Sequence, residues 1–176
     1  MKKLIFATGN ENKMKEIRMI LADCGYEILS MKEAGIQADI VEDGKTFEEN
    51  AIIKAEAIRK MTNCLVLADD SGLEVDYLDK APGIYSARFM GEDTPYRIKN
   101  KAIIDKLAGV PDEKRTARFV CAIAAAFHGC TFAGILSGKY ETIGSSSDNF
   151  PSASKRPIAM DVKLLLIENM RCSVSF

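Results

Sequence analysis

The stretch LIFATGNENK, residues 4–13, decides the fold class of this chain. Residues 4–7 form a short apolar run of the kind found in buried strands, and Thr8, Gly9 and Asn10 interrupt it. The apolar side chains that follow recur at helical spacing until Gly25, at Ile17, Ile20, Leu21 and Cys24. The stretch therefore predicts a strand, a turn and a helix.

The same alternation continues along the chain. We expect further strands at residues 26–30, 64–68 and 116–127, with residues 130–136 as the hairpin partner of the last one. A helix is expected to begin after Thr46, because Glu49 follows three residues later in a capping-box pattern. A second helix is expected over residues 95–107. Strands interleaved with helices indicate an α/β or α+β domain.

Length, composition and charge bound the class of protein. A chain of 176 residues with 47% apolar residues fits one globular domain. The 24 lysines and arginines balance 25 acidic residues, which leaves no electrostatic footprint for a nucleic acid or an anionic membrane. No apolar run approaches the ~20 residues of a membrane span, and the run after the opening Met-Lys-Lys is too short for a signal peptide. We expect no nucleic-acid partner and no membrane association.

Cysteine and histidine usage narrows the chemistry. The five cysteines contain no C-x-x-C pair, which argues against a disulfide framework and a cysteine-ligated zinc and suits a reducing cytoplasm. His128 is the single histidine, so we do not expect catalysis by a Ser-His-Asp triad. Any catalysis must rely on carboxylates and lysines.

The segment at residues 8–13 is a candidate phosphate site. A helix N-terminus presents unpaired N–H groups, Gly9 allows close backbone approach, and Lys13 adds a cation, so phosphate oxygens fit here. An ordinary capped strand-to-helix turn would use the same residue types. Both interpretations stand on the sequence alone.

A second candidate site is built from carboxylates. Asp69 and Asp70 are expected to end the strand at residues 64–68, where open α/β sheets place ligands, and one of them can hold Mg²⁺ or a water. Glu42 can supply another oxygen ligand. Lys54, at the border of the buried helix face, can neutralise a phosphate or a carboxylate. Each residue also has an ordinary interpretation, as a turn, a solvated acidic loop or a snorkelling lysine.

Four blocks in order resemble the non-standard purine NTP pyrophosphatase family, which includes ITPases and dITP/XTP pyrophosphatases. They read FATGNENK, TFEENAIIKA, LADDSGLEVD and APGIYSARF, at residues 6–13, 46–55, 67–76 and 81–89. The resemblance covers about the first 135 residues.

This resemblance implies an α/β fold with an elongated mixed sheet, flanking helices and two lobes around a central nucleotide cleft. It implies a homodimer that hydrolyses ITP, dITP or XTP to the monophosphate and pyrophosphate. Glu42 and Asp70 would bind Mg²⁺, Asp70 would act as general base and Lys54 would support the phosphates. Ser71 would contact the substrate, and the triphosphate would be held by Thr8, Gly9, Asn10, Glu11, Asn12 and Lys13.

The C-terminal quarter departs from the family pattern. The family continues with Phe-Gly-Tyr-Asp-Pro and Ser-His-Arg motifs that recognise the purine, and neither occurs in this sequence. Where the first is expected, residues 142–150 read TIGSSSDNF. We interpret residues 1–176 as a single NTP pyrophosphatase domain with an atypical segment at 137–176, caused by a frameshift near residues 136–141 or by true divergence. The alternative functions are a catalytically impaired nucleotide-binding remnant and a pyrophosphatase for another modified nucleotide.

Overall fold

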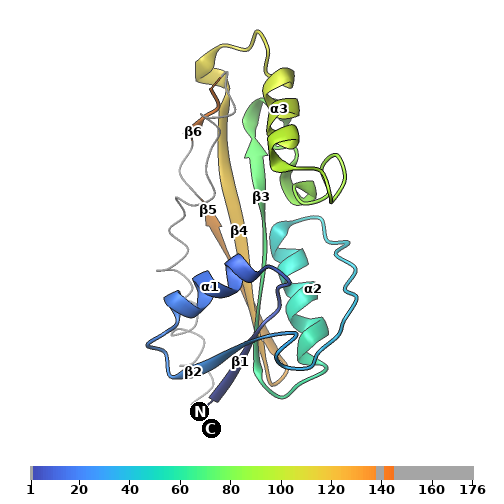
Figure 1. The fold of residues 1–176 in the computed structure, drawn as a ribbon, viewed down its shortest axis with the longest axis vertical. Coiled ribbons are helices and arrows are strands. Elements are labelled where there is room, and N and C mark those ends of the chain that lie inside the picture. The colour runs from blue at the N-terminus through green and yellow to red at the C-terminus, as the bar shows by residue number, and fades with distance from the viewer. Residues whose placement is uncertain (1, 138–140, 145–176) are drawn as a thin grey trace. The chain divides into compact units, whose positions relative to one another are not determined.

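The computed structural model describes residues 2–137 and 141–144, and these form a mixed α/β structure (Figure 1). They fall into two compact units, the first at residues 2–70 and 122–136 and the second at 71–121, 137 and 141–144. The strands form one six-stranded sheet in the order β2-β1-β3-β4-β5, with β6 paired to β4. The predicted α/β class is confirmed.

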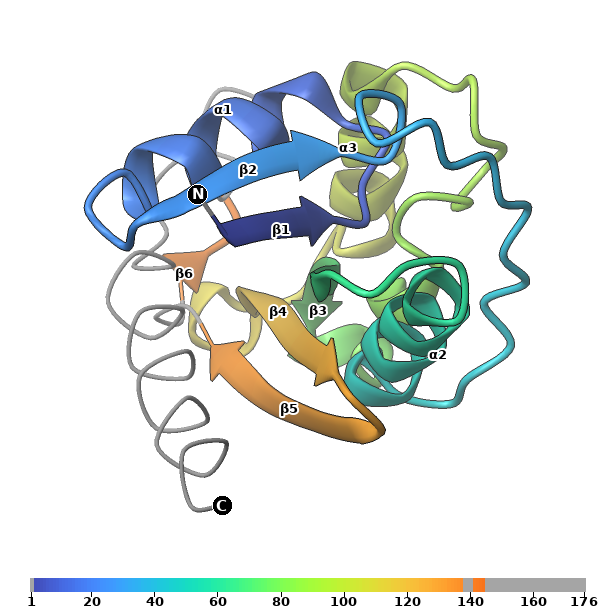
Figure 2. The same cartoon turned by 90° about the horizontal axis from the view of Figure 1, so that it is seen from below.

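The first unit begins with a β-α-β arrangement. Strand β1 (Lys2–Phe6) pairs in parallel with β2 (Tyr26–Ser30), from Lys2 opposite Tyr26 to Phe6 opposite Ser30. Helix α1 (Glu11–Ile20) connects them and lies against this pair (Figure 2). Its buried residues are Met14, Ile17 and Ile20. The predicted strand, turn and helix are confirmed, although the helix ends at Ile20 and Leu21 caps it.

Helix α2 (Phe47–Arg59) also begins as the sequence predicts. The Thr46 hydroxyl accepts a hydrogen bond from Glu49 N at 3.1 Å. The Glu49 carboxylate accepts one from Lys45 N at 2.6 Å. It therefore pairs with the backbone N–H of the residue before the cap, and not with the N–H of Thr46 as in a standard capping box. The buried stripe consists of four apolar residues, Phe47, Ala51, Ala55 and Ile58, and of one polar residue, Asn50.

The expected end of the third strand at Asp69 is wrong. Strand β3 (Leu65–Val75) runs without interruption through Asp69, Asp70 and Ser71. Extended backbone tolerates these polar side chains because both carboxylates find partners within the first unit: Lys13 for Asp69 and Asn50 for Asp70. The strand thus continues from the first unit into the second.

The long strand β4 (Thr116–Phe127) and its neighbour β5 (Cys130–Ser137) form the predicted hairpin. His128 and Gly129 make the turn, with φ of 44° and 84°. Positive φ at both central residues is the requirement of a type I′ turn, whose twist matches that of the flanking strands. This placement gives His128 a role in the turn.

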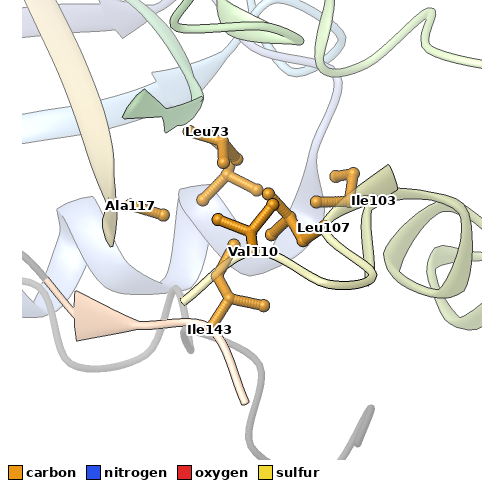
Figure 3. Packing of buried hydrophobic residues seen from close by; sticks show 7 residues of the cluster. Leu73, Ile103, Leu107, Val110, Ala117 and Ile143 are labelled. Carbon is orange, nitrogen blue, oxygen red and sulfur yellow. The ribbon is translucent and has the colours of Figure 1, made fainter. Parts of the chain in front are cut away.

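The second unit packs helix α3 (Tyr96–Lys106) beside the outer part of β3 and β4. The described part of this unit also contains three short 3₁₀ helices, Asp76–Leu78, Gly83–Tyr85 and Asp112–Lys114, and the two-residue strand β6 (Glu141–Thr142). Figure 3 shows its core, which consists of Leu73, Val75, Ile103, Leu107, Val110, Ala117 and Ile143. Burial of these side chains removes apolar surface from water and stabilises the unit.

Arg118 is the charged residue of β4 whose burial needs a partner. Its guanidinium pairs with Glu74 and with Asp76, the latter at 3.4 Å, and the Thr116 hydroxyl donates to Asp76 at 2.6 Å. The opposite charges for Arg118 therefore come from the end of β3 and from the 3₁₀ helix that follows it. No helix in the described part of the chain is long and apolar enough to cross a membrane.

We expect Glu33, in the turn after β2, to make a pH-dependent contribution to stability. Ser30 N and Oγ and the Arg18 guanidinium all donate to one Glu33 carboxylate oxygen, at 2.7, 2.8 and 2.6 Å. The Ser30 backbone N–H, with these other donors, lowers the pKa of Glu33 from 4.5 to about 2. Since the folded-state pKa is depressed, the stabilisation is present above 4.5 and is lost as the pH falls towards 2.

We therefore expect Glu33→Gln to lower the thermal midpoint near neutral pH, and this difference from wild type to shrink as the pH falls from about 4.5 to about 2. Thermal unfolding followed by circular dichroism across this range measures it. Glu16→Gln, which neutralises an exposed glutamate of α1, is the control. A Glu33→Gln difference independent of pH would contradict the assignment.

Candidate functional site

The candidate site lies where the parallel pairing of β1 and β3 ends. The last paired residues are Phe6 and Leu67, and Ala7 N then donates to Leu67 O at 2.7 Å. Beyond this point β1 gives way to the loop at residues 8–10, while β3 continues into Asp69 and Asp70. The carboxyl ends of parallel strands are where α/β sheets place ligands. Here β1 ends while β3 continues, so a ligand site at this point stays a prediction.

The turn at the start of α1 is capped by its own residues. The Asn10 side chain accepts from Asn12 N at 2.9 Å and from Lys13 N at 3.3 Å, and Asn10 N donates to the Thr8 hydroxyl at 3.2 Å. Glu11 and Asn12 are exposed, and a Cβ on Gly9 would meet nothing within 4 Å. The geometry is that of the capped turn, and phosphate binding at residues 8–13 stays a prediction.

Lys13 reaches across to β3. Its Nζ lies 2.6 Å from Asp69 Oδ2, in an ion pair whose side chains are 31% and 6% exposed respectively. The Asp69 carboxylate is therefore buried, whereas part of the Lys13 side chain faces solvent. This contact joins the first loop to the acidic pair of β3.

Lys54 connects the acidic loop to the same strand. Its Nζ donates to the Asp69 backbone carbonyl at 2.7 Å and lies 3.1 Å from Glu42 Oε2. The Lys54 side chain is only 16% exposed, so the two contacts replace most of its hydration. Glu42 and Lys54, 12 positions apart in the chain, are thus brought together as the sequence suggested.

Asn50 is the residue that sequence reasoning missed. It is 1% exposed, its Nδ2 donates to Asp70 Oδ2 at 3.0 Å, and its Oδ1 accepts from Gly44 N at 2.9 Å. The available signal was a polar residue at helical spacing on a buried apolar stripe, because such a residue needs internal partners. A buried carboxamide thus links the acidic loop to Asp70.

Three carboxylates and two ammonium groups meet in this part of the first unit: Glu42, Asp69, Asp70, Lys13 and Lys54. In the described part of the chain, no group of three or more His, Cys, Asp or Glu side chains could hold a metal ion by itself. Mg²⁺ typically takes one or two protein carboxylates and completes its shell with waters and substrate phosphates. The donor set of Glu42 and Asp70 suits such an ion. Ser71 follows Asp70 in β3, half-buried, as the first residue of the second unit.

Comparison with known proteins agrees with these features. The model of the Ham1 family matches residues 4–150. The chain belongs to the Ham1 family. The resemblance noted in the sequence is thereby confirmed, because relatives in this family carry the name dITP/XTP pyrophosphatase.

Two such relatives are the dITP/XTP pyrophosphatases of Clostridium perfringens, 51% identical over 131 residues, and of Bacillus subtilis, 47% identical over 129 residues. The matches cover 71% and 73% of this chain but 64% and 65% of the relatives. The chain thus spans less than two thirds of the length of the curated relatives it matches.

Solved structures of Ham1 proteins have the same fold. The Staphylococcus aureus Ham1 protein superposes with a TM-score of 0.78 at 28% identity, covering 96% of this chain and all of that one. The Coxiella burnetii Ham1 protein gives 0.75 at 31% identity and covers 83% of this chain and 75% of that one. The Ham1 fold is therefore shared by this chain.

Proposed function

We propose that this chain is a nucleoside-triphosphate pyrophosphatase that hydrolyses non-standard purine nucleotides, ITP, dITP and XTP, to the monophosphate and pyrophosphate. The relatives named dITP/XTP pyrophosphatase support this proposal. The observation that carries it is the convergence of Lys13, Lys54 and Asn50 on Asp69 and Asp70. Lysines can stabilise the charge that develops on the phosphates during cleavage of a phosphoanhydride, and carboxylates can hold a divalent metal ion.

The charge balance of the site supports a dependence on divalent metal. With three carboxylates against two ammonium groups, the site is acidic and would repel a triphosphate. Glu42 and Asp70 are the residues that would hold Mg²⁺. When bound, the ion would supply positive charge and make a coordinated water more acidic.

The roles of the chain's own residues follow from their positions. Asp70 would accept a proton from the water that attacks the α-phosphorus, and the bond to the β-phosphate oxygen would break to release pyrophosphate. Lys13 and Lys54 would neutralise charge on the phosphates. Thr8, Gly9, Asn10, Glu11 and Asn12 would line the triphosphate, and Ser71 would contact the substrate.

Two further parts of the proposal rest on the resemblance and the sequence. We propose a homodimer, which sedimentation velocity would test directly. We also propose a cytoplasmic location, because the five cysteines of the sequence contain no C-x-x-C pair and are odd in number, which suits a reducing compartment.

The test is pyrophosphate release from ITP, dITP, XTP, GTP and ATP at slightly alkaline pH, with Mg²⁺ and with EDTA. We expect release from ITP, dITP and XTP in preference to GTP and ATP, and none with EDTA. Preference for a different modified base would instead support the related pyrophosphatase. A folded sample that binds triphosphates with Mg²⁺ but releases nothing would support the nucleotide-binding remnant.

A further inference from the structure

Asn50 stands out because its burial is complete and both ends of its side chain are used. It lies on the apolar stripe of α2, where an unsatisfied amide would be costly. Its two hydrogen bonds join different elements of the proposed metal site. One is to the Gly44 backbone, two residues after Glu42, and the other is to the Asp70 carboxylate. One side chain therefore touches both elements that would supply the metal ligands.

The partners of Asn50 fix the orientation of its amide. Gly44 N can only donate and the Asp70 carboxylate accepts, so Oδ1 must face the loop and Nδ2 must face β3. A flipped amide would set two acceptors against each other and two donors against each other. The hydrogen-bond pattern is thus specific to asparagine in this rotamer.

The loop packs directly on this amide. A Cβ on Gly44 would lie 2.6 Å from Asn50 Oδ1 and 2.9 Å from Asn50 N, closer than real contacts allow. A side chain at this position would therefore push the loop away from α2. Glu42 itself forms an ion pair with Lys54, and Lys54 also donates to the Asp69 backbone carbonyl of β3.

We propose that Asn50 is a positioning residue that sets the Asp70 carboxylate and the Glu42 loop in the arrangement needed for divalent-metal binding. This inference rests on the proposed function of the same site. The mechanism is preorganisation: a donor to one carboxylate oxygen fixes the plane of the Asp70 carboxylate, and an acceptor for Gly44 N fixes the loop. Partners that orient metal ligands in this way commonly change metal affinity by about 10- to 100-fold when removed.

The test compares Asn50→Leu, which keeps the branching of the side chain at Cγ but removes both hydrogen bonds, with Thr46→Ala. The control removes the cap of the same helix without touching Asp70. Mn²⁺ binding is titrated by electron paramagnetic resonance in the presence of a non-hydrolysable α,β-methylene analogue of ITP. We expect Asn50→Leu to raise the Mn²⁺ midpoint by about 10-fold or more and Thr46→Ala to stay near wild type.

A second variant guards against misfolding. Asn50→Ser is smaller and polar, and its hydroxyl is too short to reach Gly44 N and Asp70 together, so its midpoint should rise in the same direction. In both Asn50 variants kcat should fall at limiting metal, with an unchanged KM for nucleotide at saturating metal.

Several outcomes would overturn the inference. One is wild-type metal affinity in folded Asn50→Leu or Asn50→Ser. Another is an equal loss of affinity in Thr46→Ala, because the loss would then come from destabilisation of α2 and not from the two hydrogen bonds of Asn50. Wild-type protein that binds no Mn²⁺ would overturn both this inference and the proposed function. Binding by wild type with unaltered variants would leave the proposed function standing.

Discussion

Asp70→Asn is expected to lower Mg²⁺-dependent pyrophosphate release by about 10²- to 10⁴-fold, the usual loss on removing a general base. The substitution keeps the shape of the side chain, and the new amide oxygen can still accept from Asn50 Nδ2. The amide cannot take up the proton of the attacking water and is a poorer ligand for Mg²⁺. Activity should therefore fall far more than stability.

This experiment needs a matched control and a stability measurement. Asp79→Asn makes the same change at an exposed carboxylate with φ of 51°, a conformation that asparagine tolerates well. It should leave both activity and the unfolding midpoint unchanged. Retention of more than about a tenth of the activity by Asp70→Asn would exclude Asp70 as the base.

Local signals were sufficient where a short segment determines its own structure. The capping pair Thr46 and Glu49 marks the start of α2, and the apolar spacing of its stripe marks its buried face. The hairpin of β4 and β5 also follows from local pattern, because β-rich segments on both sides of His128 and Gly129 leave room only for a tight turn.

The sequence failed where long-range partners decide the conformation. Asp69 and Asp70 have the composition of a strand end, yet β3 continues through them, because Lys13 and Asn50 are supplied from 56 and 20 positions away. The role of Asn50 is hidden for the same reason. Its residue type shows a need for partners, but only the fold shows that one partner is a carboxylate of the candidate site.

The ion pair between Lys13 and Asp69 should respond asymmetrically to removal of its two partners. Lys13→Met leaves the Asp69 carboxylate, 6% exposed, without its cation, and an uncompensated buried charge is strongly destabilising. We expect a loss of about 2–4 kcal/mol in the free energy of unfolding. Asp69→Asn leaves an ammonium group on a side chain 31% exposed, where water solvates it, so the expected loss is about 1 kcal/mol or less.

Urea unfolding at neutral pH measures these differences, and the double variant separates the explanations. If the cost of Lys13→Met comes from the stranded carboxylate, then adding Asp69→Asn removes that charge and should restore part of the lost stability. If the cost came from lost packing of the lysine stem, the double variant would be no more stable than Lys13→Met alone. Recovery in the double variant would therefore show that Lys13 stabilises the fold mainly by compensating the buried charge of Asp69.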